Sequence, residues 1–206
     1  GGGIYGKWDS SIIDGCIIRN NTAGAGGGIF GFGNSQALSD CTIEGNTANG
    51  NMGGGIYCYY SNTLILTACT LSGNSSKTAD GIYAAGVSIL IIDANTSDTI
   101  LCADGARLIL NTGSTLDVTG DCIPASEGVV SMDLDDLSAI APLQLSGELH
   151  RQGGLGLTND SNTLLKSQAG DVIPFAEASS LAGDGFDSIV FPLMPPGLGL
   201  RLVEQT

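Results

Sequence analysis

Gly-Gly-Gly-Ile-Tyr at residues 1–5 returns as Gly-Gly-Gly-Ile-Phe at 26–30 and as Gly-Gly-Gly-Ile-Tyr at 53–57. When the copies are aligned on the isoleucine, a weaker fourth copy follows at Ile82, and the spacings are 25, 27 and 26 residues. A second motif, Cys-x-Ile/Leu-x-x-Asn, begins 12 or 13 residues after each of the first three isoleucines. Two motifs that keep the same phase over three copies indicate a structural repeat of about 26 residues.

The length of this repeat selects among the known repeat architectures. Helical repeats are excluded because each glycine inside a helix costs about 1 kcal/mol. Leucine-rich repeats need a motif that is missing, and propeller blades need about 40 residues or more. A repeat of this length suits one coil of a parallel β-helix, in which two or three short strands are joined by tight turns. We therefore predict an all-β solenoid of about eight coils of ~26 residues, stacked about 4.8 Å apart, with irregular coils or a cap toward the C-terminus.

Stacking of the coils places equivalent residues above one another. Because side chains alternate along a strand, the cysteine and the aliphatic residue two positions later share one face, which we place inward. A turn at the asparagine favours a ladder of amides bonded from coil to coil. An aromatic stack is also expected, which forms core if it faces inward and a glycan-binding surface if it faces outward. The predicted ladders are Ile4/Ile29/Ile56/Ile82, Ile18/Ile43/Leu71, Cys16/Cys41/Cys69, Asn21/Asn46/Asn74 and Tyr5/Phe30/Tyr57/Tyr83.

The two motifs resemble the right-handed β-helix repeats of bacterial surface and secreted proteins, including polymorphic outer-membrane-type repeats. The resemblance covers residues 1–100 and implies a right-handed parallel β-helix, a fold that serves adhesins, lyases and structural proteins alike. The segments Leu143–Leu149, Ala169–Phe175, Gly183–Asp187 and Phe191–Leu200 are similar to the closing module of autotransporter-like passengers. That similarity implies extracellular display at a bacterial cell surface. A shift in composition near Pro124 divides residues 1–125, the repeats, from residues 126–206, a solenoid continuation or cap.

Charge and hydropathy exclude several classes of function. The net charge is −14 with only seven basic residues, so binding to a nucleic-acid backbone is not expected. No apolar run approaches the ~20 residues of a membrane-spanning helix. The glycine-rich stretches lack the Gly-Lys-Ser/Thr ending of a phosphate loop. We expect no cofactor.

Catalytic residues are not expected either. The acidic groups Asp133/Asp135/Asp136 and Asp184/Asp187 lie in turn-like sequence, and we interpret them as solvated turns rather than as calcium ligands or a catalytic pair. A glycosidase needs two carboxyl groups held about 5–9.5 Å apart in a cleft. His150, the only histidine, has Arg151 beside it and no evident partner, so we interpret it as a surface residue. We predict no catalytic residue, no metal site and no enzymatic activity.

Covalent modification has two groups of candidates. Stacked cysteines are close enough for disulfides, but their side chains run parallel, so we expect buried thiols at Cys16, Cys41 and Cys69. Cys102 and Cys122 are the better candidates for a disulfide, with Cys58 as a competing partner. Asparagine sequons occur at four positions, of which Asn74 is explained by the ladder. The remaining candidate glycosylation sites are Asn20, Asn95 and Asn159.

These observations lead to one main hypothesis and two rivals. Because Gly1 begins within a repeat, we expect a longer chain or a homo-oligomer that contacts through exposed coil ends. The main hypothesis is an extracellular structural solenoid: a surface stalk, an adhesin passenger, or a filament subunit that stacks head to tail. The rivals are a polysaccharide-acting lyase or hydrolase, which needs acidic or basic residues at equal phase in adjacent coils, and a glycan-binding module.

Overall fold

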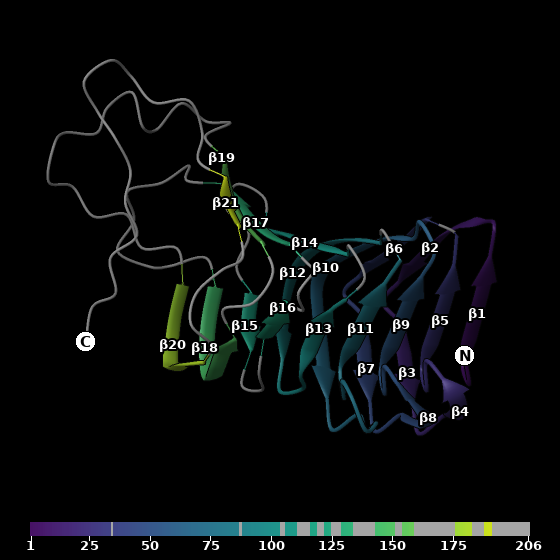
Figure 1. Ribbon diagram of the computed structural model, residues 1–206. Coiled ribbons are helices and arrows are strands. Elements are labelled where there is room, and N and C mark those ends of the chain that lie inside the picture. Colours follow the sequence, from purple (N-terminus) through teal and green to yellow (C-terminus); the bar gives the residue numbers. More distant parts are fainter. Residues whose placement is uncertain are drawn as a thin grey trace, which may run out of the picture.

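A computed structural model describes residues 1–110 apart from 34, 87, 104 and 105, and then the backbone of strands lying between residues 116 and 190. Its elements are strands, and every strand pairing is parallel. Figure 1 shows successive coils stacked side by side, with β1, β5, β9, β11 and β13 following one another from the N-terminal end. The prediction of an all-β parallel solenoid is confirmed.

The first ladder holds the isoleucine that follows each glycine run. Its register places Ile4 opposite Ile29 and Ile29 opposite Ile56. Ile82 and Ile100 continue the same column. The coil between these last two residues is only 18 residues long, in agreement with the shorter, irregular coils expected after the strict repeat. The strands of this ladder are β1 (Ile4–Lys7), β5 (Ile29–Phe32), β9 (Ile56–Tyr59), β11 (Ile82–Ala85), β13 (Ile100–Cys102) and β16 (Cys122–Pro124).

The second ladder begins after the first turn of each coil. It crosses the predicted boundary near residue 125, because β14 pairs with β17 and β17 with β19. Residues 125–128 themselves lie outside the described part. The strands are β2 (Ser10–Asp14), β6 (Ser35–Ser39), the first half of β10 (Thr63–Ser72), the first half of β12 (Ile89–Thr96), β14 (Arg107–Leu110), β17 (Val129–Asp133), β19 (Gly154–Thr158) and β21 (Ser188–Val190).

A third ladder completes the coils, and a small separate sheet joins the first two of them. The third ladder uses the second halves of β10 and β12, where one continuous strand bends from one face of the solenoid to the next. The other strands of this ladder are β3 (Ile17–Arg19), β7 (Thr42–Glu44), β15 (Leu116–Val118), β18 (Leu143–His150) and β20 (Ala176–Ala182); the small sheet pairs β4 (Thr22–Ala25) with β8 (Thr47–Met52).

The interior is filled by aliphatic columns. Within the described residues, twelve large side chains are almost fully buried, and each contributes roughly 1.5–3 kcal/mol by leaving water. They fall in register along the ladders, so each coil covers the core of the next: Ile29, Leu38, Ile43, Ile56, Leu64, Leu66, Leu71, Ile82, Leu90, Ile92, Ile100 and Leu108.

The turn after the first ladder repeats one backbone conformation. Gly33 and Gly86 adopt left-handed φ angles of 59° and 64°. The register gives the same place in the first and third coils to Trp8 and Tyr60, whose φ angles are 56° and 60°. A bulky residue in this region costs of order 1–3 kcal/mol, whereas glycine adopts it freely. Two coils therefore place a strained aromatic residue where the other two place glycine.

Candidate functional site

The predicted asparagine column lies at the turn after the third ladder. Both the backbone N–H and the side-chain amide of Asn21 donate to Oδ1 of Asn46, each at 3.0 Å. Asn46 repeats this arrangement toward Oδ1 of Asn74, at 3.0 and 2.9 Å. The side-chain amides of Asn46 and Asn74 also donate to the carbonyls of Ile18 and Ile43 in the preceding coils. The column binds coil to coil and is structural.

Within the described residues, the column ends on a residue that the sequence did not reveal. Both amide groups of Asn74 donate to Oδ2 of Asp98, at 3.1 and 2.7 Å, and Asp98 is buried. Asp98 lies only two residues before Ile100, whereas Asn74 lies eight residues before Ile82. The shortened coil lacks the glycine run that would have aligned the two positions, so the sequence carries no clear signal for Asp98.

The predicted cysteine column is also structural. The thiols of Cys41 and Cys69 are buried and donate to carbonyls two residues earlier, at Ser39 and Thr67. Burial raises the pKa of the Cys69 thiol. Cys16, by contrast, is exposed, so the prediction of a buried thiol is wrong at this position. All three are free thiols.

The remaining candidate cysteines lie along the first ladder. Cys58 is a fully buried free thiol, and burial raises its pKa. The register pairs Ile100 with Cys122 and Cys102 with Pro124. The side chain of Cys122 lies outside the described residues, so the disulfide between Cys102 and Cys122 stays a prediction.

The other sequence candidates are not brought together in the described structure. Asn20 is an exposed turn residue with a φ angle of 56°, and its side chain is accessible. The side chains of Asn95, Asp133 and His150, all at strand positions, lie outside the described residues. The same holds for Asp135, Asp136, Asn159, Asp184 and Asp187. Within the described residues there is no group of three or more side chains suited to hold a metal ion, and no candidate helix for crossing a bilayer.

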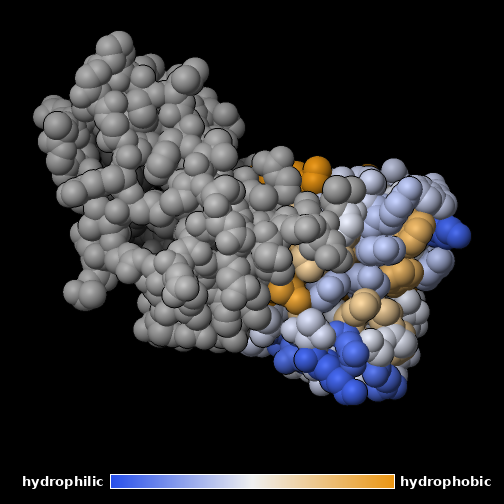
Figure 2. Space-filling view, viewed as in Figure 1, coloured by the Kyte–Doolittle hydropathy of each residue, from blue (hydrophilic) through white to orange (hydrophobic). Residues whose placement is uncertain are grey.

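A cluster of aromatic side chains covers the outer face of the first ladder. The isoleucines of this ladder point inward, so the residues that alternate with them point outward. The face gathers all five tyrosines and the single tryptophan of the chain. Figure 2 shows hydrophobic residues set among pale ones on the coils, and strongly hydrophilic residues collected at the lower edge. We call this set the aromatic face: Tyr5, Trp8, Phe30, Phe32, Tyr57, Tyr59, Tyr60 and Tyr83.

The rings contact one another along and across the coils. Centroids in the column of Tyr5, Phe30, Tyr57 and Tyr83 are 5.3, 5.1 and 5.4 Å apart. Such pairs contribute about 0.5–1.5 kcal/mol each beyond their burial. The cluster is not closed to solvent, because Tyr5 and Trp8 are 57% and 59% exposed and Tyr60 is 51% exposed. Tyr57, which lies between Phe30 and Tyr83 in the column, is buried, so the cluster is an ordered aromatic surface that is only partly exposed.

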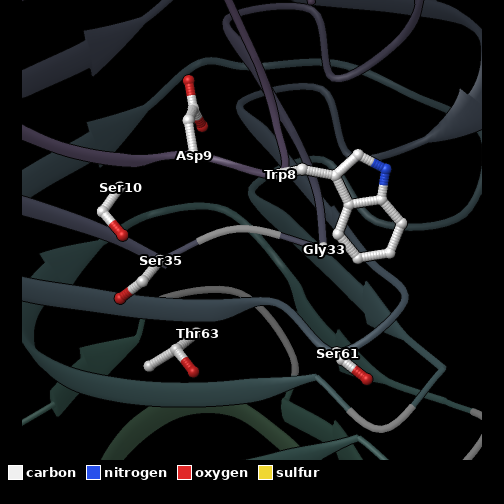
Figure 3. A pocket seen from close by; sticks show the side chains of 7 residues that line it. All are labelled: Trp8, Asp9, Ser10, Gly33, Ser35, Ser61 and Thr63. Carbon is white, nitrogen blue, oxygen red and sulfur yellow. The ribbon is translucent and has the colours of Figure 1, made fainter.

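At its edge the aromatic face meets a hollow of about 450 Å³. We call this the corner hollow, and Figure 3 shows the seven residues that line it. The hydroxyl-bearing residues Ser10, Ser35 and Thr63 are directly in register on successive strands. The indole of Trp8 lies on the other side of the turn from this row. The lining residues are Trp8, Asp9, Ser10, Gly33, Ser35, Ser61 and Thr63.

The electrostatics of this region are those of an uncharged or weakly acidic surface. Among the described residues that line the corner hollow, only Asp9 carries a formal charge. Lys7 places its ammonium 5.7 Å from the centroid of Phe32, where it makes a cation–π contact. The described surface here combines flat apolar rings with hydroxyl groups.

Half of the aromatic face was expected from the sequence and half was not. The column Tyr5/Phe30/Tyr57/Tyr83 follows from the repeat, and the structure places it outward. Phe32, Tyr59, Trp8 and Tyr60 were missed, although Phe32 and Tyr59 stand two residues after the predicted column and therefore on the same face. That alternation was the available signal.

Comparison with protein families matches the model of the right-handed beta helix region to residues 2–120. The chain is a right-handed β-helix protein. The match covers the regular coils, the aromatic face and the corner hollow. Comparisons with curated proteins and with solved structures give no match.

Proposed function

We propose that this β-helix is a non-catalytic extracellular stalk of the adhesin type, which binds glycans through its aromatic face. The observation that carries the proposal is a group of four exposed rings on one outer face of the coils: Tyr5, Trp8, Tyr59 and Tyr60. A monomeric soluble protein rarely keeps so many large exposed rings in one patch without a partner. The rings are also held in fixed positions by their neighbours, so they lose little conformational entropy when a ligand binds.

Glycans are the partner whose chemistry fits best. A pyranose ring has one or two flat faces of C–H groups and a rim of hydroxyls. Aromatic side chains cover the flat C–H faces, and the hydroxyl groups of tyrosine, serine and threonine hydrogen-bond with the hydroxyls of the sugar. The aromatic face supplies rings repeated from coil to coil, and the corner hollow supplies hydroxyls. Because Tyr57 is buried, a glycan would stack on the exposed rings of the aromatic face.

The stalk part of the proposal follows from the architecture. In a solenoid each coil contacts only its neighbours, so added coils extend a rod and carry the same face outward. Display at a bacterial surface and stacking of chains into filaments were expectations from the sequence and stay proposals. Electron microscopy of the chain at rising concentration tests whether the chains form filaments. Dispersed particles at all concentrations would contradict this part of the proposal.

Binding to a panel of immobilised polysaccharides tests the glycan proposal. We expect retention of the wild-type chain by at least one polysaccharide, and at least a tenfold loss of affinity when Tyr5 and Tyr59 are both changed to alanine. The matched control is Ile17→Thr, because Ile17 is an exposed apolar residue on another face and stands in register with Thr42 and Thr70. Equal retention of the double variant and the control would contradict the proposal, as would no retention at all.

The enzymatic rival is tested with the same polysaccharides. A lyase or hydrolase would release unsaturated or reducing ends over time. For a binding stalk we expect retention without any such release.

A further inference from the structure

The oxidisable rings of the aromatic face contact one another from the first coil to the fourth. Trp8 stands nearly perpendicular to Tyr60, at a centroid distance of 5.5 Å. The ring of Tyr60 is 6.4 Å from that of Tyr59, which stacks on Tyr57 at 5.9 Å. Tyr57 in turn meets Tyr83 at 5.4 Å. We call this continuous series of ring contacts the ring relay: Trp8, Tyr60, Tyr59, Tyr57 and Tyr83.

Gly33 makes the first of these contacts possible. Trp8 belongs to the first coil and Tyr60 to the third, and the register places Gly33 of the second coil between them. A Cβ atom at Gly33 would overlap the six-membered ring of the indole, so the indole lies directly over the glycine backbone. Figure 3 shows this indole turned away from the serine and threonine hydroxyls of the corner hollow. Trp8 is therefore placed for contact with other rings.

The chemistry of these rings is that of one-electron oxidation. Tyrosine and tryptophan are the aromatic side chains that a mild oxidant attacks, whereas phenylalanine resists it. A phenol that loses an electron also releases its O–H proton to water and becomes a neutral tyrosyl radical. An indole loses an electron and its N–H proton in the same way. Because the rings touch, a tyrosine can give an electron to a tryptophan radical without movement of either residue, and the radical settles on tyrosine, the more easily oxidised of the two.

Exposure decides which members of the ring relay can react with another molecule. Trp8 is 59% exposed, so an oxidant reaches it directly. Tyr60 and Tyr59 are 51% and 38% exposed, whereas Tyr57 is buried. A radical formed anywhere along the described contacts therefore has two accessible tyrosines, side by side, on which to react further.

Tyr5 provides a comparison within the same surface. It is 57% exposed, more than either Tyr59 or Tyr60. Its ring stacks on Phe30, and Phe30 lies between it and Tyr57. Because phenylalanine does not carry the radical, Tyr5 is separated from the ring relay. Exposure alone favours Tyr5 as the most reactive tyrosine, whereas the ring contacts favour Tyr60 and Tyr59.

We propose that Tyr59 and Tyr60, with Trp8 beside them, are a site of oxidative coupling between two copies of this chain, driven by a peroxidase and hydrogen peroxide. Two tyrosyl radicals, one on each copy, form a bond between ring carbons ortho to the hydroxyls. The hydrogen on each of these carbons then moves to the oxygen, which restores both phenols. In sum, two phenols lose two electrons and two protons, and one hydrogen peroxide takes them up to give two waters. Within one copy the packing keeps Tyr59 and Tyr60 too far apart for such a bond.

Pulse radiolysis of the whole chain tests the transfer from Trp8, which is the only tryptophan. The azide radical oxidises tryptophan faster than tyrosine, so the first species is the tryptophan radical. We expect its absorption to decay while that of the tyrosyl radical grows, at a rate independent of protein concentration. Tyr60→Phe is expected to slow this step at least fivefold, and the matched control Tyr5→Phe to leave it unchanged. A rate proportional to protein concentration, or equal rates in the two variants, would overturn the proposal.

Treatment with a haem peroxidase and hydrogen peroxide tests the coupling, in high salt because the net charge of −14 keeps the copies apart. We expect dityrosine fluorescence and covalent dimers on reducing gels, which exclude disulfides of the exposed Cys16. Mass spectrometry of digested dimers should place the bond at Tyr59 or Tyr60. Changing both to phenylalanine should lower the dimer yield at least fivefold, and Tyr5→Phe should not. Coupling mainly at Tyr5, or dityrosine confined to monomers, would contradict the proposal; circular dichroism verifies that each variant is folded.

Discussion

At the scale of single residues, Gln36 is the least satisfied side chain of the described core. It is fully buried, and neither its amide nitrogen nor its amide oxygen has a hydrogen-bond partner. The register places it in a column with Leu64, Leu90 and Leu108. Replacing a buried, unpaired amide by a side chain of similar size removes a desolvation cost of about 1–3 kcal/mol.

We therefore predict that Gln36→Leu stabilises the protein by about 1–2 kcal/mol. Urea denaturation measures the change, with Gln36→Ala as the control that removes the amide but leaves a cavity. A lower stability of Gln36→Leu than of the wild type would show that a buried water pairs with the amide.

Cys58 gives the molecule a pH dependence at the alkaline end. Burial raises the pKa of its thiol above the ordinary value of 9.0, so the folded state keeps the proton while the unfolded state releases it. Above that ordinary pKa the unfolded state binds fewer protons, and the free energy of unfolding falls as the pH rises, by about 1.4 kcal/mol per pH unit. Below that ordinary pKa the thiol is protonated in both states, so it does not make the free energy of unfolding depend on pH.

The prediction is a loss of stability above pH 9 that Cys58→Ala reduces. Alanine suits the position, because Ala84 follows Cys58 in the same column. Denaturation midpoints of both proteins between pH 7 and pH 10 provide the test, and the difference between the two curves isolates the thiol. Parallel curves would contradict this assignment.

At the scale of turns and strands, Gly33 and Gly73 form a natural pair for comparison. Both have left-handed φ angles, 59° and 60°, so alanine at either costs backbone strain of about 1 kcal/mol. A Cβ at Gly73 meets nothing within 4 Å, whereas one at Gly33 meets the indole of Trp8. We predict that only Gly33→Ala shifts the tryptophan fluorescence and destabilises beyond the strain that the two share. Identical effects on fluorescence and stability would show that the indole does not depend on this contact.

The elements also show how far sequence reasoning reached. The inward isoleucines follow from the spacing of the glycine runs, because strand alternation and a fixed period determine both face and register. Asp98 was missed because its coil is shorter than the period. The contact of Trp8 with Tyr60 was missed because it joins coils that are not adjacent, across Gly33. The repeat length predicts which residues are neighbours in consecutive coils. It does not predict a side chain that crosses over a glycine to contact the coil after next.

At the scale of the whole molecule, energetic coupling should be confined to neighbouring coils. Asn46→Ala removes four hydrogen bonds and is expected to cost roughly 2–4 kcal/mol. Combined with Asn74→Ala in the next coil, the total should be smaller than the sum by about 0.5 kcal/mol or more, because both changes remove the bond between the two side chains. Combined with Leu108→Ala, several coils away, the costs should add within about 0.5 kcal/mol. Denaturation of the single and double variants tests both statements; strong coupling of the distant pair would contradict the nearest-neighbour description.

The buried carboxylate of Asp98 gives this solenoid a direction. The side chain of asparagine both accepts and donates, so it can relay a bonding pattern from one coil to the next, whereas the side chain of aspartate has no N–H to donate. The backbone N–H of Asp98 also turns away from the column and donates to Oγ1 of Thr96. Asparagine at this position therefore continues the hydrogen-bonded column into the next coil, and aspartate ends it. Coils copied from residues 26–52 should therefore insert ahead of Asp98 with their amide bonds intact, but the same coil placed after it would find no donor to continue from.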